Sequence, residues 1–212
     1  MKKKLLWMIP LAIVIGIGFA MLDWPIWMGI ALFVFIAILE IPIMLYTLYA
    51  SQNLARITKY IVQNRKNPIF QYMYLLPEGT EASLIEAIDT ILRKYKQPNI
   101  QAIYGANRAI LLEDFDEARR LVYPVLQSEL GQYTMALIAA MQGNGEEMQQ
   151  YKVEKEWMKA GLEANLAFAQ GDTATFDRTS QQAIDSAKGV QYYGNIYVFK
   201  RMRDSKSKSV AL

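Results

Sequence analysis

The chain of 212 residues contains no cysteine and no histidine. Without cysteine it can form no disulfide, no thiolate nucleophile and no thiolate metal site. Without histidine it lacks the commonest general base and the commonest neutral metal ligand. Serine–histidine–acid and cysteine–histidine catalysis are therefore excluded. An enzyme built from this sequence would depend on carboxylates, lysines, tyrosines or a bound cofactor.

Charged residues are scarce in the first 50 positions and ordinary afterwards. Residues 1–50 contain three lysines and two acidic residues, whereas the rest of the chain holds 20 basic and 18 acidic residues. The net charge of +3 does not mark a nucleic-acid-binding face, on which basic residues would be concentrated. No GxxxxGK[ST] loop is present, and the acidic cluster Glu113–Glu117 lacks the spacing of a calcium loop. The sequence thus predicts no catalytic residue, no metal, no cofactor and no nucleic-acid partner.

Two apolar runs lie close together near the N-terminus. Leu5–Leu22 is an uncharged run of 18 residues, and Ile26–Tyr49 has Glu40 as its single charge. A helix needs about 20 apolar residues to cross a hydrocarbon core of ~30 Å, so both runs qualify, the first only just. Asp23-Trp24-Pro25 permits little but a tight turn, and its tryptophan suits a membrane interface. We therefore predict a transmembrane helical hairpin over residues 1–50.

A cleaved signal peptide is the alternative for the first run, which also begins with lysines. The run is longer than a signal core of ~7–15 residues, however, and a second apolar run follows at once. Basic residues flank the hairpin on its outer sides, with Lys2–Lys4 before it and Arg56 and Lys59 after it, and none in the turn. The positive-inside rule then places both termini in the cytoplasm, at a membrane expected to be the bacterial inner membrane.

Glu40 lies about nine residues before the end of the second run, roughly 13 Å along a helix. An acid at that depth is costly and is by default a functional hypothesis, here pairing with a partner helix, cation binding or proton relay. Two residues later Pro42 removes a backbone donor and can kink the helix. We favour the alternative, in which Glu40 is protonated or reaches water near the cytoplasmic face, because the first run offers it no partner.

Residues 51–79 are predicted to form a juxtamembrane helix and a linker. Apolar residues at helical spacing predict that the second run continues as a helix until Asn67-Pro68. The apolar stretch Ile69–Leu76 packs either against the membrane interface or, as we favour, into the first surface of a soluble domain. A turn then ends at Thr80, a favourable helix-capping residue.

Residues 80–200 are predicted to form successive helices, because no alternating strand pattern occurs there. Three turns share one arrangement, in which a capping residue follows two alanines spaced three apart, on one face of the first helix. Such small side chains let a second helix approach closely. The caps are Asp114, Asn144 and Asp172; the alanine pairs are Ala106 and Ala109, Ala136 and Ala139, and Ala164 and Ala167; and the residues four positions after the caps are Ala118, Met148 and Phe176. Repetition of this kind predicts three helix–turn–helix units.

This arrangement resembles the tetratricopeptide repeat (TPR) family, best from Tyr104-Gly105-Ala106-Asn107 to Asp114-Phe115-Asp116-Glu117-Ala118. The later units keep Gly143-Asn144 and Gly171-Asp172 but lose the aromatic residue after the turn. Their spacing is also shorter than the family's usual ~34 residues. The resemblance covers about residues 99–189 and implies an all-α fold, a short TPR-like α–α solenoid that binds a protein partner on its concave side. An ordinary helical bundle with alanine-rich contacts is the alternative.

Candidate partner-binding residues follow from the resemblance. They are polar or aromatic positions on the first helix of each unit, namely Gln101, Asn107, Arg108, Gln132, Tyr133, Glu163 and Asn165. The bound segment is expected to be a peptide or helix lying in the groove of the solenoid. The basic, serine-rich residues 201–212 are expected to form a flexible tail that either touches anionic membrane lipid or, as we favour, remains solvated.

We expect from these features a non-enzymatic scaffold or adaptor that is tethered to the membrane and binds a protein through its helical repeats. One alternative is a small accessory subunit of a membrane complex, working through the transmembrane hairpin and Glu40. Another is an enzyme that acts on lipid or cell-envelope precursors. The sequence leaves the identity of the partner and the oligomeric state open.

Overall fold

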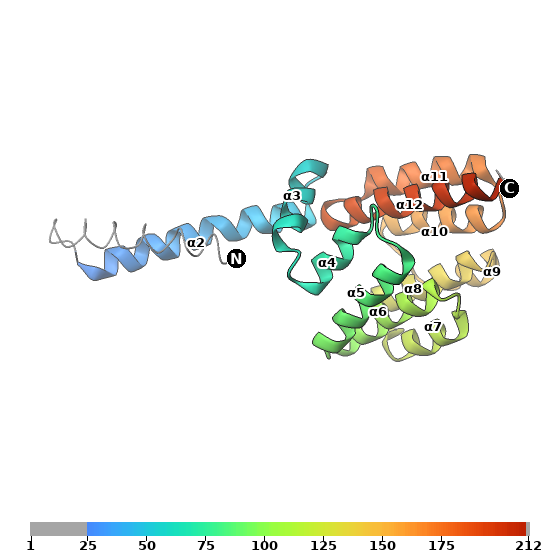
Figure 1. Cartoon of the computed structure of the whole chain (residues 1–212), viewed down its shortest axis with the longest axis horizontal. Coiled ribbons are helices and arrows are strands. Elements are labelled where there is room, and N and C mark those ends of the chain that lie inside the picture. The colour runs from blue at the N-terminus through green and yellow to red at the C-terminus, as the bar shows by residue number, and fades with distance from the viewer. Residues whose placement is uncertain (1–24, 211–212) are drawn as a thin grey trace.

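The computed structural model describes residues 25–210, in which every regular element is a helix and no strand occurs. The all-α prediction is therefore confirmed, whereas the first predicted span, Leu5–Leu22, lies outside the described residues. Figure 1 shows α2 extending away from a domain formed by the other helices. In chain order the elements are α2 (Ile26–Tyr49), α3 (Leu54–Asn64), α4 (Pro68–Leu75), α5 (Glu81–Lys94), α6 (Pro98–Leu111), α7 (Phe115–Val122), the 3-10 helix η1 (Tyr123–Val125), α8 (Glu129–Met141), α9 (Gly145–Met148), α10 (Glu156–Ala169), α11 (Thr173–Ser186) and α12 (Gly189–Val210).

Side-chain caps begin the second helix of each predicted unit. The side-chain oxygens of Asp114, Asn144 and Asp172 each accept a hydrogen bond from the backbone N–H three residues later, over 3.0–3.1 Å. Thr80 caps α5 in the same way, over 3.2 Å. These bonds satisfy backbone donors that have no partner inside a helix, and the predicted caps are confirmed.

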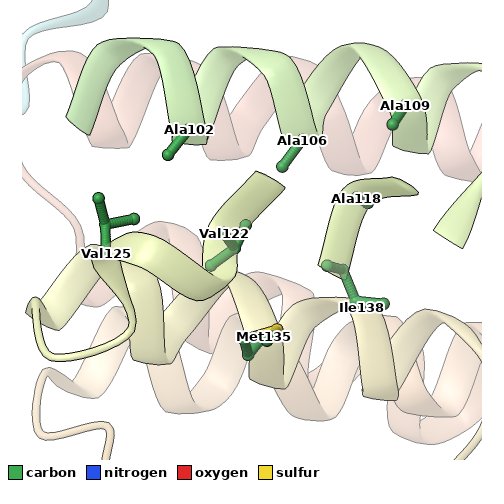
Figure 2. Packing of buried hydrophobic residues seen from close by; sticks show 8 residues of the cluster. All are labelled: Ala102, Ala106, Ala109, Ala118, Val122, Val125, Met135 and Ile138. Carbon is green, nitrogen blue, oxygen red and sulfur yellow. The ribbon is translucent and has the colours of Figure 1, made fainter. Parts of the chain in front are cut away.

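The two helices of each unit pack against each other, α6 on α7, α8 on α9 and α10 on α11. The six predicted alanines are at most 5 % exposed, and the residues four positions after the caps are buried as well. Figure 2 shows Ala102, Ala106 and Ala109 along one face of α6, opposite Ala118 and Val122 of α7. The alanine face thus allows close helix approach, as the spacing predicted.

A break separates α2 from α3, so the prediction of one continuous helix through this region is wrong. The N–H groups of Ala50 and Ser51 both donate to the carbonyl of Tyr46, over 2.9 and 2.8 Å, and thereby end α2. The side chain of Asn53 then accepts from the N–H of Arg56 over 3.0 Å and begins α3. At residues 50–53 these capping hydrogen bonds therefore take the place of the regular backbone hydrogen bonds of a continuous helix.

The turn between α11 and α12 docks on this break. The N–H of Gly189 donates to the carbonyl of Ser51 over 2.7 Å. The side-chain amide of Gln52 donates to the carbonyls of Asp185 and Ala187, over 2.7 and 2.9 Å. We call this contact between residues 51–52 and 185–189 the closing junction, because it joins the two ends of the helical domain.

The last helix, α12, extends this contact along α3. Ile57 and Ile61 are fully buried and pack with Tyr193 of α12, which is 1 % exposed. Further along α12, the guanidinium of Arg201 donates to the carbonyl of Gly79 over 2.5 Å. Contacts therefore cross residue 80, where the sequence predicted the linker to end and the helical domain to begin. The helix also extends to Val210, so residues 201–210, for which the sequence predicted a flexible tail, are part of α12.

Substituting Gly189 by alanine should destabilise the fold by about 2–4 kcal/mol. Its φ is +58°, and a Cβ atom there would lie 1.8 Å from the carbonyl oxygen of Leu48. The measurement is chemical unfolding of the full chain in detergent micelles. Gly194→Ala is the matched control on the same helix, where an added Cβ meets no atom within 4 Å. The control should stabilise the chain by about 0.5–1 kcal/mol, and equal behaviour of the two variants would contradict the closing junction.

Enlarging one alanine of the repeated face should also destabilise the fold. Ala164 is fully buried and packs in one cluster with Phe176 and Phe199. We expect Ala164→Leu to lower the free energy of unfolding by about 1–3 kcal/mol through overpacking. Ala169→Leu changes an exposed alanine of the same helix and should stay within about 0.5 kcal/mol of the parent chain. A neutral Ala164→Leu variant would show that α10 and α11 are not held closely together.

Candidate interaction surfaces

Three of the predicted partner-binding residues use their side chains inside the domain. The amide of Gln101 donates to two carbonyls near the end of α5, over 2.8 and 2.5 Å. The amide of Gln132 donates to the carbonyl of Leu126 over 2.9 Å, and its oxygen accepts from the N–H of Lys152 over 3.0 Å. Asn165 is 7 % exposed and donates to a carbonyl one turn earlier in α10. These side chains therefore hold helices and loops in place.

The other predicted residues lie nearer the surface. Arg108 of α6 pairs with Asp89 of α5, with 2.7 Å between Nε and Oδ1, and both side chains are about 40 % exposed. Glu163 is exposed on α10, and Asn107 is half-buried on α6. Because an exposed ion pair contributes little to stability, Arg108 can exchange Asp89 for another carboxylate at small cost. Asn107, Arg108 and Glu163 are thus the polar candidates for contact with a partner.

Tyr133 belongs to a set of aromatic contacts between different helices. It meets Trp157 of α10 with ring centroids 5.6 Å apart, and Tyr72 of α4 meets Tyr104 of α6 at 6.0 Å, both in edge-on geometry. We call these four residues the inner aromatic pairs. All four side chains are half-buried. Such rings combine a large apolar area with a polar group at the edge, which suits recognition of apolar side chains of a peptide.

Burial also changes the ionisation of this set. Desolvation raises the pKa of both Tyr104 and Tyr133 to about 12. Their hydroxyl groups therefore keep their protons throughout the physiological range and remain hydrogen-bond donors. Of the inner aromatic pairs, the sequence pointed only to Tyr133. A usable signal was that Tyr104 and Tyr133 each fall within three residues before the first alanine of their unit.

Most of the exposed large apolar side chains of the described residues belong to α2. Trp27, Ile30, Ile43 and Tyr49 are each 61–69 % exposed. Glu40 lies within this helix, but its side chain is outside the described part of the structure. Over residues 25–210, no helix was found to combine the length and the apolar character of a membrane span.

Small-molecule and metal sites find little support in the described residues. A hollow between α4 and α5, with Glu86 among its lining residues, has a volume of about 190 Å³. Ligand pockets usually have volumes of about 300–1,000 Å³, so this hollow is small for a substrate site. Within residues 25–210, no group of three or more acidic side chains is arranged to hold a metal ion.

Comparisons with known proteins returned nothing: no protein-family model, curated protein or solved structure matches this chain.

Because burial raises the pKa of Tyr133, we expect the folded chain to lose stability at high pH. Well below pH 10 both the folded and the unfolded chain hold the hydroxyl proton of Tyr133, so this group does not make the free energy of unfolding depend on pH. Between pH 10 and about 12 only the unfolded chain releases it, and the free energy of unfolding falls.

Tyr133→Phe should make that fall smaller by on the order of 2 kcal/mol. Unfolding free energies of both chains, measured from pH 9 to about 12, test this. Tyr104→Phe should behave in the same way, since burial raises the pKa of Tyr104 as far. An unchanged pH dependence in both variants would contradict the buried position of the aromatic pairs.

Proposed function

We propose that this chain is a non-enzymatic, membrane-anchored adaptor whose helical domain binds a protein partner in the cytoplasm. In this proposal, residues 1–50 form two membrane spans, and α2 is the second of them. The observation that carries it is the contrast between α2, with its exposed apolar side chains, and a charged, well-packed helical domain attached to its end.

The exposure of α2 supports its contact with lipid. Val34, Phe35 and Ile38 are each more than half exposed, and such a continuous apolar surface is unfavourable in water. The helix has 24 residues, which at 1.5 Å per residue reach about 36 Å. In its sequence, Glu40 is the single charged residue. These exposures and the sequence together support α2 as a membrane span.

Recognition of a protein is the role that best fits the helical domain. Its three helix pairs share caps and alanine contacts, and this arrangement supports a TPR-like interpretation. The inner aromatic pairs offer half-buried apolar surface, and Asn107, Arg108 and Glu163 offer polar groups at its surface. A peptide or amphipathic helix with apolar anchors and flanking charges is the partner that this chemistry would bind.

Site-specific photo-crosslinking of the full chain in its native membranes tests the adaptor. The full chain is required, because truncation at Thr80 would remove Ile57 and Ile61 from the core around Tyr193. We expect a crosslinker at Asn107 or Glu163 to capture the same protein. A crosslinker at Arg178, an exposed residue of the second helix α11, is the control and should not capture it.

Trp157→Ala should reduce capture from Asn107 at least about fivefold, as expected for an aromatic anchor. Circular dichroism of this variant checks that the helices remain folded. If crosslinks form only from Ile38 of α2, and only to integral membrane proteins, the chain is instead an accessory subunit. In that case α2 would be its working surface, and Glu40 the residue to change next.

A further inference from the structure

The segment that follows the apolar helix carries positive charge only. Between Glu40 and Glu78 the sequence contains no acidic residue, but it contains Arg56, Lys59, Arg65 and Lys66. All four basic side chains are exposed. The ion pairs among the described residues join other parts of the chain, so within residues 25–210 these charges have no acidic partner.

Two of these charges, Arg56 and Lys59, lie on the side of α3 that faces away from the domain, and Arg65 and Lys66 follow directly after its end. The opposite side of α3 carries Ile57 and Ile61, which are fully buried against α12. The outward side presents Arg56, Lys59 and Val62, which recur every three residues and therefore share one face. Val62 is 40 % exposed, an apolar side chain among basic ones. Amphipathic helices that lie on membranes combine these two kinds of residue.

The position of α3 relative to α2 brings this face to the end of the apolar helix. Figure 1 shows α3 crossing the end of α2, at the side of the domain from which α2 leaves. The guanidinium of Arg56 lies 5.7 Å from the ring centroid of Tyr46, in the last turns of α2. Tyr46 and Tyr49 are 52 and 69 % exposed, and tyrosine is enriched at membrane–water interfaces.

The closing junction fixes this arrangement. Residues 51–52, which connect α2 to α3, form hydrogen bonds with residues 185–189, where α11 ends and α12 begins. A flexible connection would let α3 turn its basic face in any direction. Because α2 and α3 both contact α12 and each other, these contacts restrain the direction of the face relative to α2.

We propose that the outward face of α3, formed by Arg56, Lys59, Val62 and Gln63, binds the anionic headgroups of phospholipids together with Lys66 in the turn that follows the helix. The inference rests on the proposed membrane anchoring by α2 and adds to it the class of lipid recognised. The charges favour phosphate-bearing anionic lipids by Coulomb attraction, and Val62 adds apolar contact at the boundary of the headgroups. Contact of α3 with anionic lipid would set the orientation of the whole helical domain on the membrane surface.

Fluorescence quenching in lipid nanodiscs tests this inference on the full chain. Because the chain has no cysteine, Val62→Cys supplies a single site for a fluorophore, and nitroxide-bearing lipids supply the quencher. We expect strong quenching in discs that contain phosphatidylglycerol and weak quenching in discs of phosphatidylcholine alone. High salt should abolish the difference between the two kinds of disc, since it screens exposed charges. A fluorophore at Leu112→Cys, which is 51 % exposed at the end of α6, should be quenched in neither disc.

Neutral substitutions identify the charges responsible. Each basic residue near an anionic surface favours binding about fivefold, so Lys59→Gln and Lys66→Gln should each weaken docking by about that factor. Lys152→Gln is the matched control, an exposed lysine paired with Glu154 elsewhere on the domain, and should change nothing. Equal effects of all three substitutions would overturn the assignment to α3.

A third fluorophore position distinguishes lipid binding by α3 from membrane anchoring by α2. Ile38→Cys lies on α2 and should be quenched in both kinds of disc if α2 lies in lipid. Quenching at residue 38 without quenching at residue 62 in phosphatidylglycerol discs overturns the lipid-binding face alone. Absence of quenching at residue 38 overturns the anchoring itself. If the fluorophore at residue 62 is protected from solvent only in native membranes and in neither kind of disc, a protein covers the face, and the lipid assignment is wrong.

Discussion

The hydrogen bond from Gly189 to Ser51 is the contact on which the arrangement of the chain depends. It lies where α2 and α11 end and α3 and α12 begin, and helix ends leave backbone groups without partners. The N–H of Gly189 finds the carbonyl of Ser51, and the amide of Gln52 satisfies carbonyls at the end of α11. One small contact thus satisfies several orphan groups at once. It also closes the helical domain by bringing its last helix onto its first.

The direction of α2 relative to the domain follows from this closure. Without it, residues 50–53 would be a hinge, and the domain could turn freely at the end of α2. With it, the core of Ile57, Ile61 and Tyr193 extends from α3 into α12, and α2, α3 and α12 contact one another. An adaptor held in this way would present both its inner aromatic pairs and its basic α3 face in a defined orientation, which lowers the entropic cost of binding a partner at the membrane.

The features predictable from the sequence were those decided within a few residues. The caps at Asp114, Asn144 and Asp172 bond to groups three residues away, and the alanine faces follow from helical period and side-chain size. The break after α2 was not predicted, because residues more than 130 positions away stabilise it. The capping residue Asn53 was its only local signal. Gln101 and Gln132 were predicted to face a partner. Polar side chains on a helix can equally well donate hydrogen bonds to neighbouring backbone carbonyls, and the amides of both residues do so in this structure.

Hydrogen exchange of the Gly189 amide, resolved to the single residue in the full chain, tests the closing junction most directly. If the junction joins the first and last helices, this amide should open only with the global unfolding of the domain. Its opening free energy should then match those of the buried amides of α3 and α12. Exchange at the rate of an exposed turn, while the amides of α6 and α10 stay protected, would contradict this account. It would leave α2 and the domain joined by a flexible connection.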